Sequence, residues 1–429
     1  MRDMRARIAR LAASLGVVLV LGFYAELLAH APATGQDLRV FYAAATALRD
    51  GGNPYDPGQI LRTEQRLYHP RNAAERASLA GNPYVQGPPL ALALVPLTGQ
   101  GAATAYHVEA LMLLLAALAA LALLARAMPA RYPKRWTLVL LLSPVTFLGL
   151  LLGQPDALLL LLLVAALALY RRHPLPAGFI LALGLVKPQI MVGPLILYGL
   201  LAWRHRRIGA YLAGVFGGVL VFMSSSAALA GPAIVTSWVR ELANFGGATV
   251  YTQVDISSLS TLYIAWAPRA LGLLLSTAGI VAWAALCLTT IGRDARRAAG
   301  SDAGSHAVPG EEDEGERWWL LLGLTGWLLV TPYAHPHDDV LLLPVAWYLL
   351  DRGPYRGRAR LLALLLLLSW WLLPMTSLLG LRLPLTRGLG IVPVVLLLAL
   401  LTTLRPTNPA TSAMPASPNW AIGPHRIAS

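Results

Sequence analysis

The stretch GQPDALLLLLLVAALALYRR, residues 153–172, decides the fold class of this chain. Its centre is apolar on every side, so a helix formed from it has to be buried in protein or in lipid. Polar residues stand at one end and Arg171 and Arg172 at the other, which is typical of a helix that crosses a bilayer with its basic end in the cytoplasm. The stretch therefore predicts a membrane-spanning helix.

Apolar stretches of similar character recur along the chain, and we count about twelve, with a range of ten to thirteen. They lie near residues 8–29, 103–127, 136–152, 156–170, 175–186, 188–203, 208–230, 268–291, 318–332, 338–350, 359–374 and 386–404. Stretches that approach twenty residues are long enough to cross a bilayer. The pattern predicts an all-α polytopic membrane protein, with a single integral-membrane domain over residues 1–405 and a disordered tail over 406–429.

The composition of the chain supports this class. Hydrophobic residues make up 56% of the 429 residues and charged residues 13%, against about a quarter charged in an ordinary globular chain. This composition excludes a soluble enzyme and a disordered scaffold, and the single cysteine excludes a disulfide-stabilised secreted module. The net charge of +13 does not indicate nucleic-acid binding, because the basic residues form short clusters at the ends of apolar stretches.

These basic clusters also orient the chain. If the N-terminus is cytoplasmic, the short arginine-rich loops all fall on the cytoplasmic side, as the positive-inside rule requires. We therefore expect a multi-pass plasma-membrane protein with both termini in the cytoplasm. The first segment also resembles a signal peptide with a cleavage site near Ala29-His30-Ala31, and cleavage there would leave the following residues on the same outer side.

Two longer hydrophilic stretches interrupt the apolar pattern. Residues 31–101 form a predicted extracytoplasmic loop, in which Leu38, Phe41 and Leu48 recur at helical spacing after Asp37. We expect this helix to lie flat at the membrane interface with its apolar face in the lipid. Residues 298–316 are small, polar and acidic, and they predict a disordered cytoplasmic linker.

The polar residues that are not basic anchors gather on the outer side of this topology. They come from four separate stretches: the start of the amphipathic helix at Asp37, GQPD at 153–156, KPQ at 187–189 and PYAHPHDD at 332–339. Ionisable groups at this depth are unfavourable unless they meet water or each other, so we expect the four stretches to share one cavity.

Each of these residues also has a simpler interpretation. Asp37 and Asp156 would both suit the N-cap of a helix, and Lys187 could extend its ammonium group to the interface. The histidines and aspartates of 332–339 could bind a divalent metal, although their spacing matches no recognised motif. Glu26 and Glu109 lie within predicted spans, where they would serve as buried polar partners.

Taken in order, these motifs resemble glycosyltransferase family 87. The resemblance rests on an aspartate soon after the first span, NPYDP at 53–57, NPYVQGPPLALALVPL at 82–97, GQPDALLLLLL at 153–163, KPQ at 187–189 and the outer loop with histidines, and it covers residues 10–405. The chain departs from the family pattern at Asp156, where asparagine is usual, and its outer loop has one more histidine than expected.

The resemblance implies a GT-C fold and an inverting transfer of a sugar, mannose being the commonest in the family. The donor would be a polyprenyl-phosphate sugar, and the acceptor a hydroxyl of a lipid or glycolipid on the extracytoplasmic face. Asp37 would be the general base, and Lys187 with one of His335 and His337 would contact the donor phosphate. The possible substrate-pocket residues are Tyr42, Tyr55, Tyr84, Gln154 and Gln189. No metal or other cofactor is expected, because a donor with one phosphate has no diphosphate for a metal to bridge.

Three other functions remain open on the sequence alone. A lipid-linked-sugar flippase or secondary transporter would also have proline-broken spans and intramembrane carboxylates, although transporter sites tend to lie at the bilayer midplane. Another membrane transferase with the same lipid carrier, or a non-catalytic scaffold, would also account for the composition. Transport of donor without any glycoside product would favour the transporter.

Overall fold

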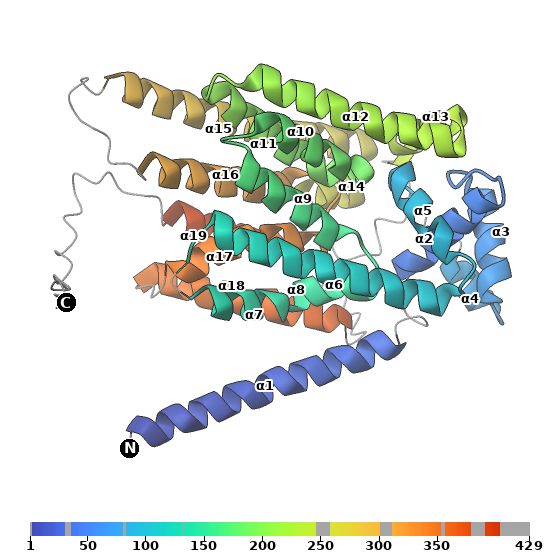
Figure 1. Ribbon diagram of the computed structural model, residues 1–429, viewed down its shortest axis with the longest axis horizontal. Coiled ribbons are helices and arrows are strands. Elements are labelled where there is room, and N and C mark those ends of the chain that lie inside the picture. The colour runs from blue at the N-terminus through green and yellow to red at the C-terminus, as the bar shows by residue number, and fades with distance from the viewer. Residues whose placement is uncertain are drawn as a thin grey trace, which may run out of the picture.

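The computed structural model describes residues 2–30, 36–79, 83–130, 132–245, 258–300, 311–352, 357–378 and 391–403. Within these ranges every regular element is a helix (Figure 1). The α-helices are α1 (Arg2–His30), α2 (Gln36–Arg49), α3 (Pro57–Tyr68), α4 (Ala73–Leu79), α5 (Pro88–Leu94), α6 (Ala102–Ala127), α7 (Pro133–Leu141), α8 (Pro144–Leu152), α9 (Asp156–Leu169), α10 (Pro174–Leu183), α11 (Pro188–Arg204), α12 (Ile208–Ala230), α13 (Pro232–Phe245), α14 (Leu259–Trp266), α15 (Arg269–Gly300), α16 (Glu311–Val330), α17 (Leu343–Asp351), α18 (Gly357–Leu378) and α19 (Ile391–Thr403). Short 3-10 helices, η2 (Val95–Leu97), η3 (Gly184–Val186) and η5 (Asp338–Leu342), extend or connect them.

Most of the predicted apolar stretches coincide with helices. The stretch 136–152 bends by 46° between α7 and α8, and a proline begins its second half. The stretches 175–186 and 188–203 are separate, as predicted, with Lys187 between them and α11 starting at Pro188. Proline suits a first helical turn, where its missing N–H would have no partner, and it breaks a helix interior.

Three helical segments in the described residues are long and apolar enough to cross a membrane: α6, α12 and residues 270–291 of α15. The bent pair of α7 and α8 makes a fourth candidate if it counts as one span. Several other apolar helices, such as α9 and α19, are shorter than a full crossing. Together these helices indicate a membrane protein.

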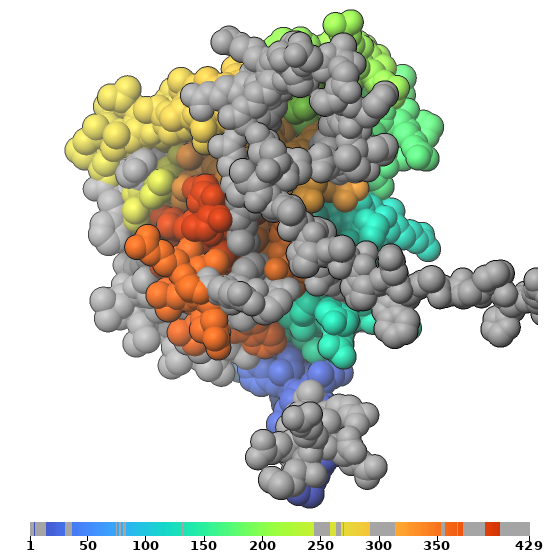
Figure 2. Space-filling view, turned by 90° about the vertical axis from the view of Figure 1, so that its left-hand side faces the viewer, coloured from blue at the N-terminus to red at the C-terminus, as the bar shows by residue number. Residues whose placement is uncertain are grey.

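The long helices run in roughly the same direction, and the short helices α2 to α5 gather at one end of the bundle, on the right of Figure 1. Helix α1 lies at the edge of the molecule, as the end-on view in Figure 2 shows in blue. The Tyr24 side chain attaches α1 to the bundle, because its hydroxyl donates to the carbonyl of Leu142 at 2.9 Å and its ring stacks on Phe147 at 3.7 Å.

The apolar face of α2 is covered by protein, which corrects the expectation that this face lies in the lipid. Leu38 and Phe41 are buried, and so are Val40, Tyr42 and the alanines on the other faces. α3, α5 and η2 pack against it. Protein rather than lipid therefore covers α2, because a run of alanines lets neighbouring helices approach closely.

The predicted linker over 298–316 is also corrected at both ends. Helix α15 continues to Gly300, and α16 already begins at Glu311. Glu316 is buried and binds Tyr170, Arg171 and His205, with its carboxylate 2.5 to 3.1 Å from their polar atoms. Residues 301–310, like the predicted tail 406–429, lie outside the described residues.

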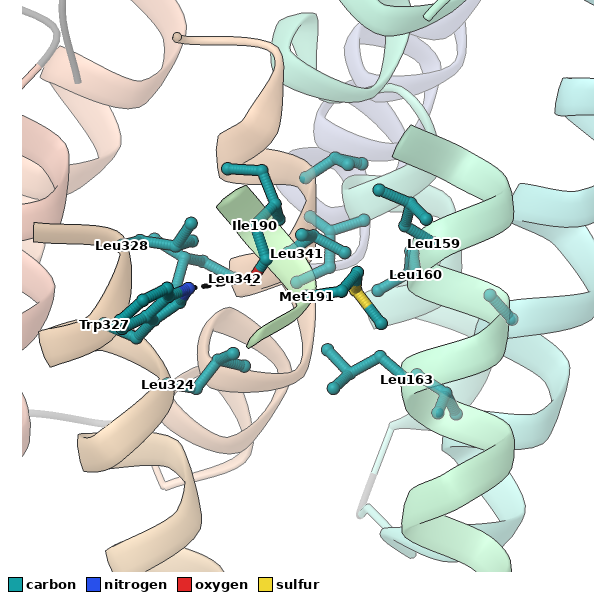
Figure 3. Packing of buried hydrophobic residues seen from close by; sticks show 14 of the residues in the cluster. Leu159, Leu160, Leu163, Ile190, Met191, Leu324, Trp327, Leu328, Leu341 and Leu342 are labelled. Carbon is teal, nitrogen blue, oxygen red and sulfur yellow. Dashed lines mark hydrogen bonds between the residues drawn. The ribbon is translucent and has the colours of Figure 1, made fainter. Parts of the chain in front are cut away.

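A tightly packed core supports the end of the bundle where α9, α11, α16 and η5 meet (Figure 3). Leu160, Met191 and Leu341 fill its centre and are fully buried. The indole of Trp327 donates to the carbonyl of Ile190 at 2.8 Å, which fixes the first turn of α11 against α16. This first turn directly follows Lys187, so the core also fixes the position of that lysine.

Candidate functional site

The structure places Asp37 beside Gln154. Asp37 is the second residue of α2, and its Oδ2 accepts a hydrogen bond of 2.9 Å from the Gln154 amide. Its carboxylate lies within the first helical turn, where the helix dipole favours a negative charge. Asp37 is partly exposed and Gln154 is buried. A carboxylate with one fixed partner and one accessible side can still accept a proton from a ligand.

Gly153 allows this contact. It ends α8 in the left-handed conformation with φ of 71°, which glycine adopts without strain. A Cβ at this position would lie 2.9 Å from Cβ of Leu38 and 3.2 Å from Oε2 of Glu109. The absence of a side chain thus lets α2 approach the loop that carries Gln154.

Lys187 is enclosed by polar side chains and does not extend to the surface of the molecule. Only 1% of its surface is exposed, and its ammonium lies 2.8 Å from Oδ1 of Asp156 and 2.5 Å from Oδ1 of Asp338. A third contact, of 3.3 Å, goes to Oε1 of Gln154. These three contacts use the three hydrogens of the ammonium group.

The outer loop 332–339 folds around Asp338. The backbone N–H of His335 donates to Oδ2 of Asp338 at 2.8 Å, and the N–H of Asp338 donates to the carbonyl of His335 at 2.9 Å. The two histidine rings lie 5.3 Å apart, and both are buried. Nε2 of His337 lies 3.9 Å from Oδ2 of Asp156 and from Oδ2 of Asp338.

A continuous polar chain therefore joins residues that are far apart in sequence. It leads from Asp37 through Gln154 to Lys187, and from Lys187 to Asp156 and Asp338. These five residues and His337 form what we call the outer-end cluster, after its place at the end of the bundle that carries α2. The cluster unites all four stretches in which the sequence predicted functional residues.

The predicted tyrosines have structural contacts instead. The hydroxyl of Tyr42 donates to the carbonyl of Thr98, that of Tyr55 to Gln86 and that of Tyr84 to Gly87, at 2.7 to 3.1 Å. All three side chains are buried. Their hydrogen bonds connect α2, the NPYDP turn and α5, and a place in the substrate pocket stays a prediction.

Other residues singled out in the sequence have different surroundings. The side-chain nitrogen of Gln189 is buried without a hydrogen-bond partner, as is Oε2 of Glu109 in α6. Glu26, by contrast, is 72% exposed and lies 3.4 Å from His30. Asp156 does not cap α9, because it is already the first residue of that helix and its side chain binds Lys187.

Asp156 and Asp338 were not among the predicted site residues. A usable signal was present, because a lysine buried between apolar helices needs carboxylates close to it. Asp156 and Asp338 lie at the same predicted membrane level as Lys187, each at the start of a predicted span. The pairing of both with one lysine nevertheless depends on how α9, α11 and η5 pack.

The fold and this site together define a helical membrane protein with a buried ionic cluster at one end. A family model, glycosyltransferase family 87, matches residues 84–306, more than half of the chain, and the chain belongs to that family. The match includes Gln154, Asp156 and Lys187 but neither Asp37 nor the outer loop. Comparisons with curated proteins and with solved structures gave no match. Membership in the family favours a glycosyltransferase over the transporter, flippase and scaffold alternatives.

Proposed function

We propose that this protein is an inverting glycosyltransferase that uses a polyprenyl-phosphate sugar, mannose being the first candidate, as donor. The acceptor is a hydroxyl group of a lipid or glycolipid on the extracytoplasmic side of the plasma membrane. The single observation that carries the proposal is the outer-end cluster, in which a partly exposed carboxylate and a buried lysine are joined by Gln154. It occurs at one end of a bundle of apolar helices in a chain of a glycosyltransferase family.

Asp37 is the proposed general base. The acceptor oxygen attacks the anomeric carbon as the bond from that carbon to the phosphate oxygen breaks, and Asp37 takes the acceptor's proton. Polyprenyl phosphate leaves on the opposite face, so the configuration at the anomeric carbon inverts. The hydrogen bond from Gln154 orients the Asp37 carboxylate and leaves its other oxygen available.

Lys187 is the proposed contact for the donor phosphate, together with a histidine of the outer loop. Its contact to Gln154, at 3.3 Å, is the longest of its three. We propose that a phosphate oxygen replaces this contact while the two carboxylates hold the lysine in place. Charge-assisted hydrogen bonds to phosphate are stronger than those to a neutral amide, which favours the exchange.

The proposal includes a GT-C fold with about twelve membrane crossings. The agreement between the described helices and the predicted apolar stretches supports it. Helices shorter than a full crossing, such as α9 and α10, would pair with neighbouring helices or be accommodated by local thinning of the bilayer. In this arrangement the outer-end cluster lies at the extracytoplasmic ends of the helices.

The experiment that tests the proposal is sugar transfer in proteoliposomes with the Asp37→Asn variant. Asparagine keeps the shape and the hydrogen bond from Gln154 but is not a base, so we expect transfer to be lost while donor binding is kept. Asp50→Asn, at an exposed carboxylate in the same outer region that pairs with Arg49 and Arg66, is the matched control. Full turnover by Asp37→Asn would contradict the assignment, and donor transport without glycoside would contradict the transferase function.

A further inference from the structure

We propose that Asp156, His337 and Asp338 bind a divalent metal ion beside Lys187. This inference deepens the proposed function and rests on it in part, because one of its arguments concerns the charge of the donor. The geometric arguments stand on the described residues alone. No metal was expected from the sequence resemblance.

The first argument is that three ligand atoms converge. One atom from each of the three side chains lies within 4.8 Å of the other two. Nε2 of His337 is 3.9 Å from an oxygen of each aspartate. Small divalent cations bind their ligands at about 2.1 Å, so two ligands of one ion can lie up to about 4.2 Å apart. Both measured separations fit one shared ion.

The second argument is that two of these atoms are buried without a partner. Nε2 of His337 and Oδ2 of Asp156 have no hydrogen-bond partner, and their residues are 5% and 0% exposed. A buried polar atom without a partner destabilises the folded state. Since the two atoms lie 3.9 Å apart, one ligand between them would satisfy both.

The third argument is the way the carboxylates divide their oxygens. Asp156 and Asp338 each give Oδ1 to Lys187, which leaves Oδ2 of each for a second cation. Oδ2 of Asp338 also accepts the N–H of His335, but a carboxylate oxygen has two lone pairs. The backbone contact therefore orients this oxygen and leaves it free to bind a metal.

The charge of the outer-end cluster also favours a bound cation. Asp37, Asp156 and Asp338 carry three negative charges when ionised, and Lys187 is the cation in direct contact with two of them. An anionic phosphate would enter this site against a net negative field. A divalent ion would offset that field and offer open coordination positions to the phosphate oxygens.

The ligand set indicates the kind of ion. Two carboxylate oxygens suit magnesium or manganese, and the imidazole nitrogen favours manganese over magnesium. Manganese is also paramagnetic, which makes it the practical probe. We therefore test the site with Mn²⁺ alone, in the absence of donor and acceptor.

The experiment is a titration of the full-length, detergent-purified protein with Mn²⁺, after EDTA has removed bound metals and has itself been removed. The intensity of the electron paramagnetic resonance spectrum of free Mn²⁺ reports how much of the ion is bound. We expect one saturable site per chain, and an affinity at least tenfold lower in both His337→Ala and Asp156→Asn. His107→Ala, at an exposed histidine of α6, is the matched control and should bind as the wild type does. The size-exclusion profile of each variant shows whether it is folded.

Saturable binding that the two site variants weaken and His107→Ala retains would establish the site. Lack of saturable binding by the wild type, or equal binding by all variants, would overturn it. Sugar transfer is measured separately with EDTA present. Transfer that continues with EDTA present leaves the proposed function standing, while the titration alone decides whether the metal site exists. Metal binding without transfer from any polyprenyl-phosphate donor supports the site and removes the proposed function.

Discussion

At the scale of single residues, Gln154 is the connection on which the site depends. Its amide nitrogen donates to Asp37, and its amide oxygen accepts from Lys187. An amide can donate to an anion from its nitrogen and accept from a cation at its oxygen while remaining uncharged. The sequence places Gln154 in a turn that is predicted to be extracytoplasmic, but only the structure shows that its amide nitrogen and its amide oxygen both form hydrogen bonds.

We expect Gln154→Leu to lower kcat about tenfold to a hundredfold, because the proposed base loses its orienting hydrogen bond. The KM for the donor should change by less, since Lys187 keeps its contacts to the carboxylates of Asp156 and Asp338. Steady-state transfer kinetics in proteoliposomes measure both values. Gln100→Leu, at an exposed outer residue, is the control, and equal kinetics in the two variants would remove Gln154 from the mechanism.

Burial of Glu64 in α3 makes the stability of the folded protein depend on pH. Burial raises the pKa of its carboxyl to about 7, although Arg39 partly opposes this. Between the unfolded pKa near 4.5 and this value, the folded protein holds a proton that the unfolded chain releases, so stability decreases as pH rises. We expect the apparent Tm to fall from pH 5 to pH 8 by several degrees more in the wild type than in Glu64→Gln. A thermal unfolding series checks this, and parallel pH curves would contradict it.

At the scale of elements, proline and glycine at the ends of helices bring the site together. Pro188 starts α11 and leaves Lys187 outside regular helix, and Pro144 begins α8 after the bend. The N–H of Gly87, just before α5, donates to the carbonyl of Val186 at 2.7 Å and so fixes the turn that precedes Lys187. The helix ends are therefore positioned by contacts with one another as well as by their own sequences.

We expect Gly153→Ala to destabilise the protein by about 1–3 kcal/mol, because the residue has φ of 71° and its new Cβ would meet Leu38 at 2.9 Å. The displaced α2 should also lower transfer activity. Gly99→Ala, at an outer glycine with open space around its Cβ position, is the control. Thermal unfolding compares the two variants, and equal Tm values would show that α2 does not need the close approach.

At the scale of the whole molecule, two polar clusters lie at different ends of the bundle. The outer-end cluster lies near α2, whereas the buried Tyr170 and Glu316, together with the partly exposed Arg171 and His205, join the loops after α9 and α11 to the start of α16. These two clusters are at opposite ends of α9, since Asp156 begins that helix and Tyr170 follows it. The proposed membrane orientation puts the first cluster outside and the second inside.

Cysteine labelling of intact cells tests this orientation. In a background with Cys287→Ser, we expect a membrane-impermeant maleimide to label Arg62→Cys in α3 directly. Arg172→Cys, after α9, should react only after the cells are permeabilised. Both arginines are exposed, so access should depend on the side of the membrane. Labelling of both from outside would contradict the proposed topology.

The sequence by itself determined the helical class, the positions of most helices and the four stretches that supply the site. Apolar length and proline position are local properties, so they can be read without tertiary contacts. The tertiary structure decided that protein covers α2, that the hydroxyls of Tyr42, Tyr55 and Tyr84 bond to backbone carbonyls, and that two carboxylates hold Lys187. These outcomes depend on which helices pack together, because burial and ion pairing arise between separate segments: Asp156 is 31 residues and Asp338 151 residues from Lys187 along the chain.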